Sequence, residues 1–249
     1  MNAEFLVYAD VVLLLRLPLL LRNRPASPWA WWSKSALELL LLALVYRPHW
    51  GLLILAAVGV VLNILASPGR RFRAPSLPVL LTFLAVQLLA ASVVFAPYWA
   101  VEFRPTLLQL GQQLPEVSTL GGLVVTLLGR DSLLVGFGLL LSANEANLLI
   151  RWLLEWLQLK PGTPARTSIT AQEYERGRVI GLVERALIYG FVLAGQFAAV
   201  GFVLAGKGFT RSRDLGPEDR DFAEYVIIGT LFSSGLAILL AAAVNWGLG

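Results

Sequence analysis

The sequence predicts an all-α protein, a bundle of about seven transmembrane helices. Of its 249 residues, 57% are hydrophobic and 14% are charged, whereas charged residues make up about a quarter of a soluble domain. The charges fall mostly between apolar runs, and these runs approach the ~20 residues that cross a bilayer. The longest polar stretch, Gln158 to Arg178, is too short for a soluble domain. We therefore expect a single membrane domain over residues 1–249.

The first 104 residues are expected to form four spans, because four apolar runs are separated by turn residues or basic loops. The first run carries Asp10 in its middle, and the second carries Lys34 and Glu38 near its start. Basic loops follow the first and third runs, and the bias of basic residues to cytoplasmic loops then places the N-terminus outside. The expected spans are Phe5–Leu21, Trp29–Tyr46, Trp50–Ala66 and Leu77–Trp99.

The segment 105–130 is expected to be interfacial or re-entrant. Pro115 and Glu116 divide it into pieces of about a dozen residues, and apolar pieces of that length seldom span a bilayer. If 105–129 does cross, the number of spans rises to eight.

Three further spans are expected within 131–249. Asp131 or Ser132 begins a long helix that ends at Leu157. The next helix has its cleanest apolar window at Ala186 to Ala205, interrupted only by Gln196. The last helix begins near Pro217, since proline is favoured in the first helical turn, and it runs to about Trp246.

Several classes of site are excluded by composition. The chain has no cysteine and one histidine, so thiolate metal sites, multi-histidine zinc sites and bis-histidine haem sites are excluded. We find no Gly-rich phosphate loop and no Gly-x-Ser-x-Gly elbow. We therefore predict no catalytic residues, metal or cofactor. The net charge of +4 lies in short loops without a contiguous basic face, which argues against nucleic acid. The expected partners are the lipid bilayer and either further copies of the chain or subunits of a membrane complex.

The best candidate site is a polar group inside the apolar run that ends at Leu157. Asn144, Glu145 and Asn147 lie near its middle, and Arg151 continues the same helical stripe. Polar side chains at this depth are expensive and need partners. Two interpretations stay open: a helix–helix interface held by hydrogen bonds, and an ion or proton pathway in which Glu145 titrates.

A second set of candidate residues comes from the neighbouring helices. Arg185, Gln196 and Lys207 are spaced by eleven residues, which places them on one face of a continuous helix. Arg185 and Lys207 are then expected to reach the two membrane interfaces, while Gln196 needs a hydrogen-bond partner such as Asn144. The candidate ion pairs or interface anchors are Asp10, Glu184, Arg185, Lys207 and Glu224, with Lys207 and Glu224 expected to pair.

A set of residues in the C-terminal part of the chain carries a family resemblance. They are Gly177–Arg185, Gly195–Gln196, Ala199–Phe202, Ala205, Lys207, Asp221, Ala223–Tyr225 and Ile228–Leu231. Over about residues 177–239 this pattern resembles an uncharacterised bacterial integral-membrane family, domain of unknown function 3307. The resemblance implies a multi-pass protein of the bacterial cytoplasmic (inner) membrane and supplies no activity.

Two functional hypotheses follow from the sequence. The first is a small-solute or ion transporter, or a channel-like protein, whose pathway passes Asn144, Glu145, Asn147 and Gln196. The alternative is a non-catalytic scaffold or accessory subunit of a membrane complex, in which the same residues join helices.

Overall fold

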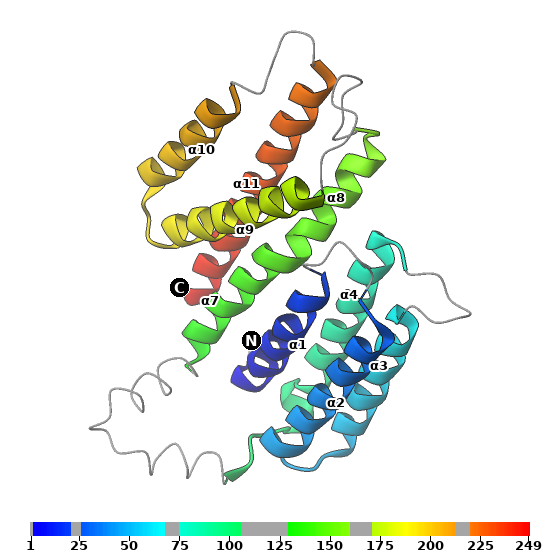
Figure 1. Ribbon diagram of the computed structural model, residues 1–249. Helices are drawn as coiled ribbons and strands as arrows, with labels where there is room; N and C mark the ends of the chain where they lie inside the picture. The colour runs from blue at the N-terminus through cyan, green and yellow to red at the C-terminus, as the bar shows by residue number, and fades with distance from the viewer. Residues whose placement is uncertain (1, 21–25, 68–74, 106–128, 160–170, 213–219) are drawn as a thin grey trace. The chain divides into compact units, whose positions relative to one another are not determined.

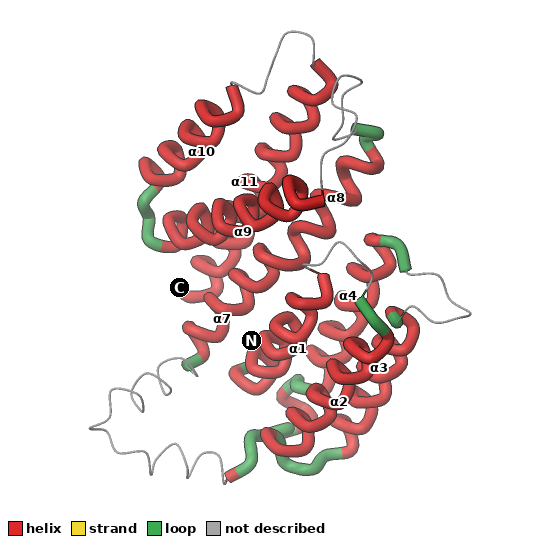
Figure 2. The backbone as a smooth tube through the Cα atoms, viewed as in Figure 1, coloured by secondary structure: helices red, strands yellow, loops and turns green. Residues whose placement is uncertain are grey.

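The chain is helical in the computed structural model, which describes residues 2–20, 26–67, 75–105, 129–159, 171–212 and 220–249. Over these residues no strand is present, apart from one isolated bridge between Tyr46 and Phe103. The all-α fold class is thus confirmed for the described part of the chain. The helices form two compact units, residues 1–140 and 141–249. Figures 1 and 2 show the helices of each unit.

The first unit is a bundle built around its N-terminal helix. Helix α1 packs against α2, α4 and α7, and α3 packs against both α2 and α4. The expected spans of this half are confirmed as helices, with ends within a few residues except for the fourth, whose last residues form a separate 3₁₀ turn. The bounds are α1 Ala3–Leu20, α2 Pro28–Val45, α3 Trp50–Ala66, α4 Leu77–Val94, the 3₁₀ turn η1 Pro97–Trp99 and α7 Arg130–Leu140.

Local capping explains where these helices begin. Pro28 and Pro78 lie in the first turns of α2 and α4, where the missing N–H costs nothing because that group has no helical partner. The single histidine, His49, caps α3: its Nδ1 accepts the N–H of Gly51 at 3.1 Å. His49 therefore has a structural role at a helix end.

The distribution of polarity in the bundle is the reverse of that in a soluble protein. Large apolar side chains are exposed on the outer faces, with Leu53, Leu89 and Leu239 at 72%, 66% and 69% exposure. Charged and amide side chains such as Arg16 and Gln87 are 2% exposed. A surface of this kind suits a hydrocarbon environment, because contiguous exposed apolar faces are rare on soluble monomers.

Three described helices are long and apolar enough to cross a bilayer, judged by length and composition. They are Leu77–Val94, Arg130–Trp156 and Glu224–Leu248. Trp50–Ala66 and Phe197–Phe209 are shorter apolar helices. The segment 106–128, on which the choice between seven and eight spans depended, lies outside the described residues.

In its described residues, the second unit has one π-helical turn and four α-helices. Helix α11 packs against α8, α9 and the π-helical turn, and α9 also packs against α10. A small apolar core of Ala146, Ile150 and Leu154 on α8 receives Ile228 and Leu236 from α11. The bounds are the π-helical turn η2 Leu141–Glu145, α8 Ala146–Trp156, α9 Ala171–Leu193, α10 Phe197–Ser212 and α11 Arg220–Leu248.

The expected continuous helix through Ala186–Ala205 is wrong. Helix α9 ends at Leu193, and the chain reverses through Ala194–Gln196 before α10 begins at Phe197. Gly195 has φ of +69°, the left-handed conformation with which glycine commonly ends a helix. Apolar residues on both sides of this turn made the two helices read as one.

Replacing Gly195 by alanine is expected to destabilise the α9–α10 turn by about 1–2 kcal/mol. No atom of the described residues would touch the new methyl group, so the expected cost comes from the left-handed backbone. The measurement is denaturant unfolding in mild detergent, followed by tryptophan fluorescence. Gly190→Ala is the matched control, because Gly190 lies within α9 with equally open space and alanine favours helix there. Equal stability of the two variants would contradict the prediction.

Candidate functional site

The predicted polar group on the helix that ends at Leu157 forms a π-helical turn. Leu141–Glu145 are π-helical, and Ser142, Asn144 and Glu145 are 0%, 2% and 6% exposed. A π-helical turn inserts an extra residue into an α-helix and is found frequently at functional sites. Asn144 Nδ2 donates to Glu145 Oε1 at 3.2 Å. Ser142 Oγ and Asn144 Oδ1 have no hydrogen-bond partner among the residues that the structure describes.

Arg185 of α9 binds this turn directly. Its Nε donates to the carbonyl of Ser142 at 2.9 Å, and its Nη2 donates to the carbonyl of Ala143 at 3.3 Å. Nη1 donates to Ser233 Oγ of α11 at 3.3 Å. Arg185 is 4% exposed, so it connects three elements inside the unit. The expectation that it reaches a membrane interface is therefore wrong. We call Ser142, Asn144, Glu145, Arg185 and Ser233 the π-turn cluster.

The other residues of the predicted stripe do not share this environment. Asn147 and Arg151 are half-buried. Gln196 lies exposed in the α9–α10 turn, and within the described chain it makes no hydrogen bond to Asn144. The expected contact between Gln196 and Asn144 is wrong, because helix α9 ends at Leu193 and therefore does not contain Gln196.

The reversal gives Lys207 a partner on α9. Because α10 folds back along α9, Lys207 Nζ bonds to Glu184 Oε2, an ion pair in which both side chains are 17% exposed. The expected pairing of Lys207 with Glu224, which lies exposed near the start of α11, stays a prediction. Glu184 and Lys207 therefore join the two arms of the hairpin.

A second buried polar cluster lies in the first unit, and we call it the Glu38 cluster. The Glu38 carboxylate is paired with the Lys34 ammonium one turn earlier on α2, and the two side chains are 5% and 1% exposed. Buried charges require a partner and further hydrogen bonds. Helices α1, α3 and α4 supply them. The cluster consists of Tyr8, Lys34, Ser35, Glu38, Asn63 and Gln87.

Asn63 and Gln87 complete the hydrogen bonding of this ion pair. Asn63 Oδ1 accepts from Lys34 Nζ at 2.9 Å, while its Nδ2 donates to Glu38 Oε2 at 2.9 Å and to Ser35 Oγ at 3.0 Å. Gln87 Nε2 donates to Glu38 Oε1 at 3.3 Å and to the Tyr8 hydroxyl at 2.9 Å. Each described amide N–H thus has an acceptor, and four helices meet at one carboxylate.

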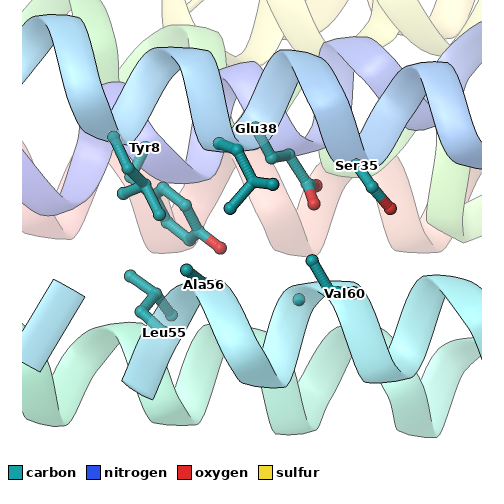
Figure 3. Close-up of a pocket in the computed structure, with 9 residues that line it drawn as sticks. Tyr8, Ser35, Glu38, Leu55, Ala56 and Val60 are labelled. Carbon is teal, nitrogen blue, oxygen red and sulfur yellow. The ribbon is translucent and has the colours of Figure 1, made fainter. Parts of the chain in front are cut away.

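A narrow pocket between α2 and α3 reaches this carboxylate. Figure 3 shows Tyr8, Ser35 and Glu38 pointing toward α3, where Ala56 and Val60 line the facing wall. The side chains leave no space for a water molecule in it. Gly59 of α3 allows the Gln87 amide and the Glu38 carboxylate to lie against this helix. A methyl group at position 59 would be 3.4 Å from both Gln87 Nε2 and Glu38 Oε2.

Sequence reasoning noted Lys34 and Glu38 but missed the cluster. Tyr8, Asn63 and Gln87 each stand in a different apolar run, so nothing local connects them. The sequence offered two signs of a buried polar cluster. Asn63 and Gln87 are uncharged polar residues inside apolar spans, and Lys34 and Glu38 are spaced as an i, i+4 ion pair.

Asp10 and Arg16 of α1 do not form a pair with each other. Arg16 Nη2 donates to the carbonyl of Leu80 on α4 at 3.1 Å. Asp10 is 8% exposed and faces α7, where Gly136 leaves room for its carboxyl group. The two side chains of α1 therefore serve different neighbouring helices, α4 and α7.

Comparisons of the chain with protein-family models, with curated proteins and with solved structures give no match. The resemblance of residues 177–239 to a bacterial membrane family stays a prediction. The function is therefore argued from the geometry of the two clusters.

Proposed function

We propose that the chain is a polytopic membrane protein that moves a small cation, a proton included, across the bilayer, and that the ion binds at the Glu38 cluster. The observation that carries the proposal is the buried Glu38 carboxylate, which lines a narrow pocket and is paired with the Lys34 ammonium. Ionisable side chains inside membrane helices are rare and commonly mark ion or proton routes. The apolar outer faces of the helices support the membrane location.

The chemistry of the cluster favours a cation over an anion. Two of its oxygen atoms, from Glu38 and Asn63, accept hydrogen bonds from the Lys34 ammonium. Oxygen ligands of this kind suit hard cations. Lys34 then acts as a tethered cation, and an ion or proton that reaches Glu38 competes with it. Release follows when Lys34 returns to the carboxylate.

The topology that accompanies this proposal has six crossings in the described chain. A seven-span bundle needed one helix through Ala186–Ala205, and a turn interrupts that helix. The α9–α10 hairpin is therefore proposed to enter and leave on one side, and the bacterial cytoplasmic membrane is proposed from the family resemblance. The proposed crossings are α1, α2, α3, α4, the helix Arg130–Trp156 and α11.

Glu145 keeps a place in the proposal as a second carboxylate for the transported ion. It is buried beside Asn144, whose Oδ1 accepts no hydrogen bond from any described residue. A π-helical turn exposes backbone carbonyls, and cation routes commonly use such oxygen atoms.

An accessory subunit of a membrane complex is the second candidate function, and one observation favours it. The pocket leaves no space for water, and the amide groups of the Glu38 cluster are satisfied by their neighbours. A closed network of this kind also serves to hold helices together. Native mass spectrometry of the protein purified in mild detergent distinguishes the two functions, because an accessory subunit is recovered with a stoichiometric second protein.

The transport proposal predicts that the double variant Lys34→Met/Glu38→Gln loses ion flux while it remains folded. Both charges are removed together, so no unpaired charge stays buried. The protein is reconstituted into vesicles that contain a pH-sensitive dye, and a potassium gradient with valinomycin sets the membrane potential that drives proton entry. In a separate measurement, sodium gradients across the vesicles test whether metal cations are transported.

Glu102→Gln is the matched control for this experiment. Glu102 pairs with Arg47 at 3.1 Å, but the side chains are 61% and 55% exposed, so flux should be retained. Equal flux in the wild-type protein and the folded double variant would refute the role of the Glu38 cluster. No flux of protons or metal cations in any vesicle, with a second protein in the native complex, would favour the accessory subunit.

A further inference from the structure

The Asp10 carboxyl group is the buried acidic group that neither cluster uses. Asp10 lies in α1 and is 8% exposed. Its Oδ1 has no hydrogen-bond partner among the residues described. On the facing helix α7, a methyl group at position 136 would lie 3.4 Å from Oδ2. The carboxyl group thus sits against a bare helix backbone.

The charged groups of the packed helices are engaged elsewhere. On α2, Lys34 and Glu38 bond to each other, and α3 and α4 carry no charged residue. On α1 itself, Arg16 donates to the carbonyl of Leu80, and Glu4 lies in the first turn. The Tyr8 hydroxyl accepts from Gln87. At the start of α7, Arg130 and Asp131 form an exposed pair at 3.5 Å.

Among the described residues, an ionised carboxylate in this position would lack both a counter-ion and a hydrogen-bond donor for Oδ1. Burial of an uncompensated charge is unfavourable, and such a group becomes neutral instead. A metal ion would need several further oxygen ligands, and Gly136, the α7 residue next to the Asp10 carboxyl group, has no side chain to supply one. A proton needs no second side chain.

We propose that Asp10 is a proton-binding site and that it is a neutral carboxylic acid in this state of the protein. It differs in this from Glu38, which is equally buried but has the Lys34 ammonium as its partner. The proposal rests on the packing of α1 against α7 and not on ion movement through the Glu38 cluster, so either can fail without the other.

The test is labelling of the whole protein with dicyclohexylcarbodiimide at neutral pH in mild detergent. This apolar reagent reacts with protonated carboxyl groups. The carboxyl O–H adds across a C=N bond of the carbodiimide, and the resulting O-acylisourea rearranges to a stable N-acylurea. Mass spectrometry of the digested protein should find the adduct on Asp10. Glu38, which is paired with Lys34, and Glu102, which is exposed and paired with Arg47, serve as internal controls and should remain at background.

Infrared spectroscopy provides a second measurement that does not depend on access of the reagent. The protein should show a carboxylic-acid C=O band at neutral pH, and Asp10→Asn should remove it. The amide is neutral and nearly the same shape as the acid, so the variant should fold. Absence of any acid band that Asp10→Asn removes would overturn the proposal, as would label on Glu38 and Glu102 at the level of Asp10.

Discussion

Replacing Lys34 by methionine is expected to destabilise the folded protein by about 3–5 kcal/mol. The methionine side chain fills similar space, but it leaves the Glu38 carboxylate buried without its cation. Asn63 Oδ1 also loses the donor that lies 2.9 Å away. The remaining amide donors of Asn63 and Gln87 cannot replace a full positive charge in an apolar bundle. Denaturant unfolding in mild detergent, followed by tryptophan fluorescence, measures the loss.

The double variant Lys34→Met/Glu38→Gln is the control that assigns this loss to charge. Removing both members of a buried ion pair is often nearly neutral, whereas removing one is costly. The double variant should therefore recover most of the stability lost by Lys34→Met. If it is no more stable than the single variant, packing of the lysine chain and not the ion pair holds α2 in place.

Replacing Arg185 by methionine is expected to destabilise the second unit by about 3 kcal/mol or more. Arg185 donates to two carbonyls of the π-helical turn and to Ser233 Oγ, and hydrogen bonds from a charged group contribute roughly 1.5–3 kcal/mol each. Without these donors the π-helical turn loses its connection to α9 and α11. Hydrogen exchange measured by mass spectrometry should rise in peptides that cover 141–145.

Two further variants define what Arg185 contributes. Arg185→Lys should restore only part of the stability, because an ammonium group cannot spread its donors as the planar guanidinium does. Arg151→Met, on half-buried Arg151 of α8, should cost less than about 1 kcal/mol. A result in which both arginine-to-methionine variants lose equal stability would contradict the connecting role of Arg185.

The sequence predicted the helices of the first unit well because their ends are marked locally. Each apolar run stops at proline, histidine or a basic loop, and α3 matches its expected bounds, Trp50 to Ala66. The turn at Ala194–Gln196 was missed because the apolar pattern continues on both sides of it. Gly195 next to Gln196 was the available sign of a helix end.

The site was predictable only where polar residues are neighbours in sequence. Asn144 and Glu145 are adjacent, so their burial could be inferred from one apolar run. Asn63 and Gln87 reach Glu38 from other helices, 25 and 49 residues away in sequence. Their meeting depends on which helix faces lie together, and that is a property of the tertiary packing.

If α2 is one of the proposed crossings, the position of Lys34 four residues before Glu38 also bears on how α2 enters the membrane. A lone charge at the centre of an inserting helix costs roughly 2.5–3.5 kcal/mol. Because the two charges share one face of a single helix, they can neutralise each other as soon as that helix forms. The helix can thus partition into lipid during synthesis as a unit without net charge, before Asn63 and Gln87 have been made. Helices α3 and α4, which are made later and in this order, can then pack against the polar face of α2.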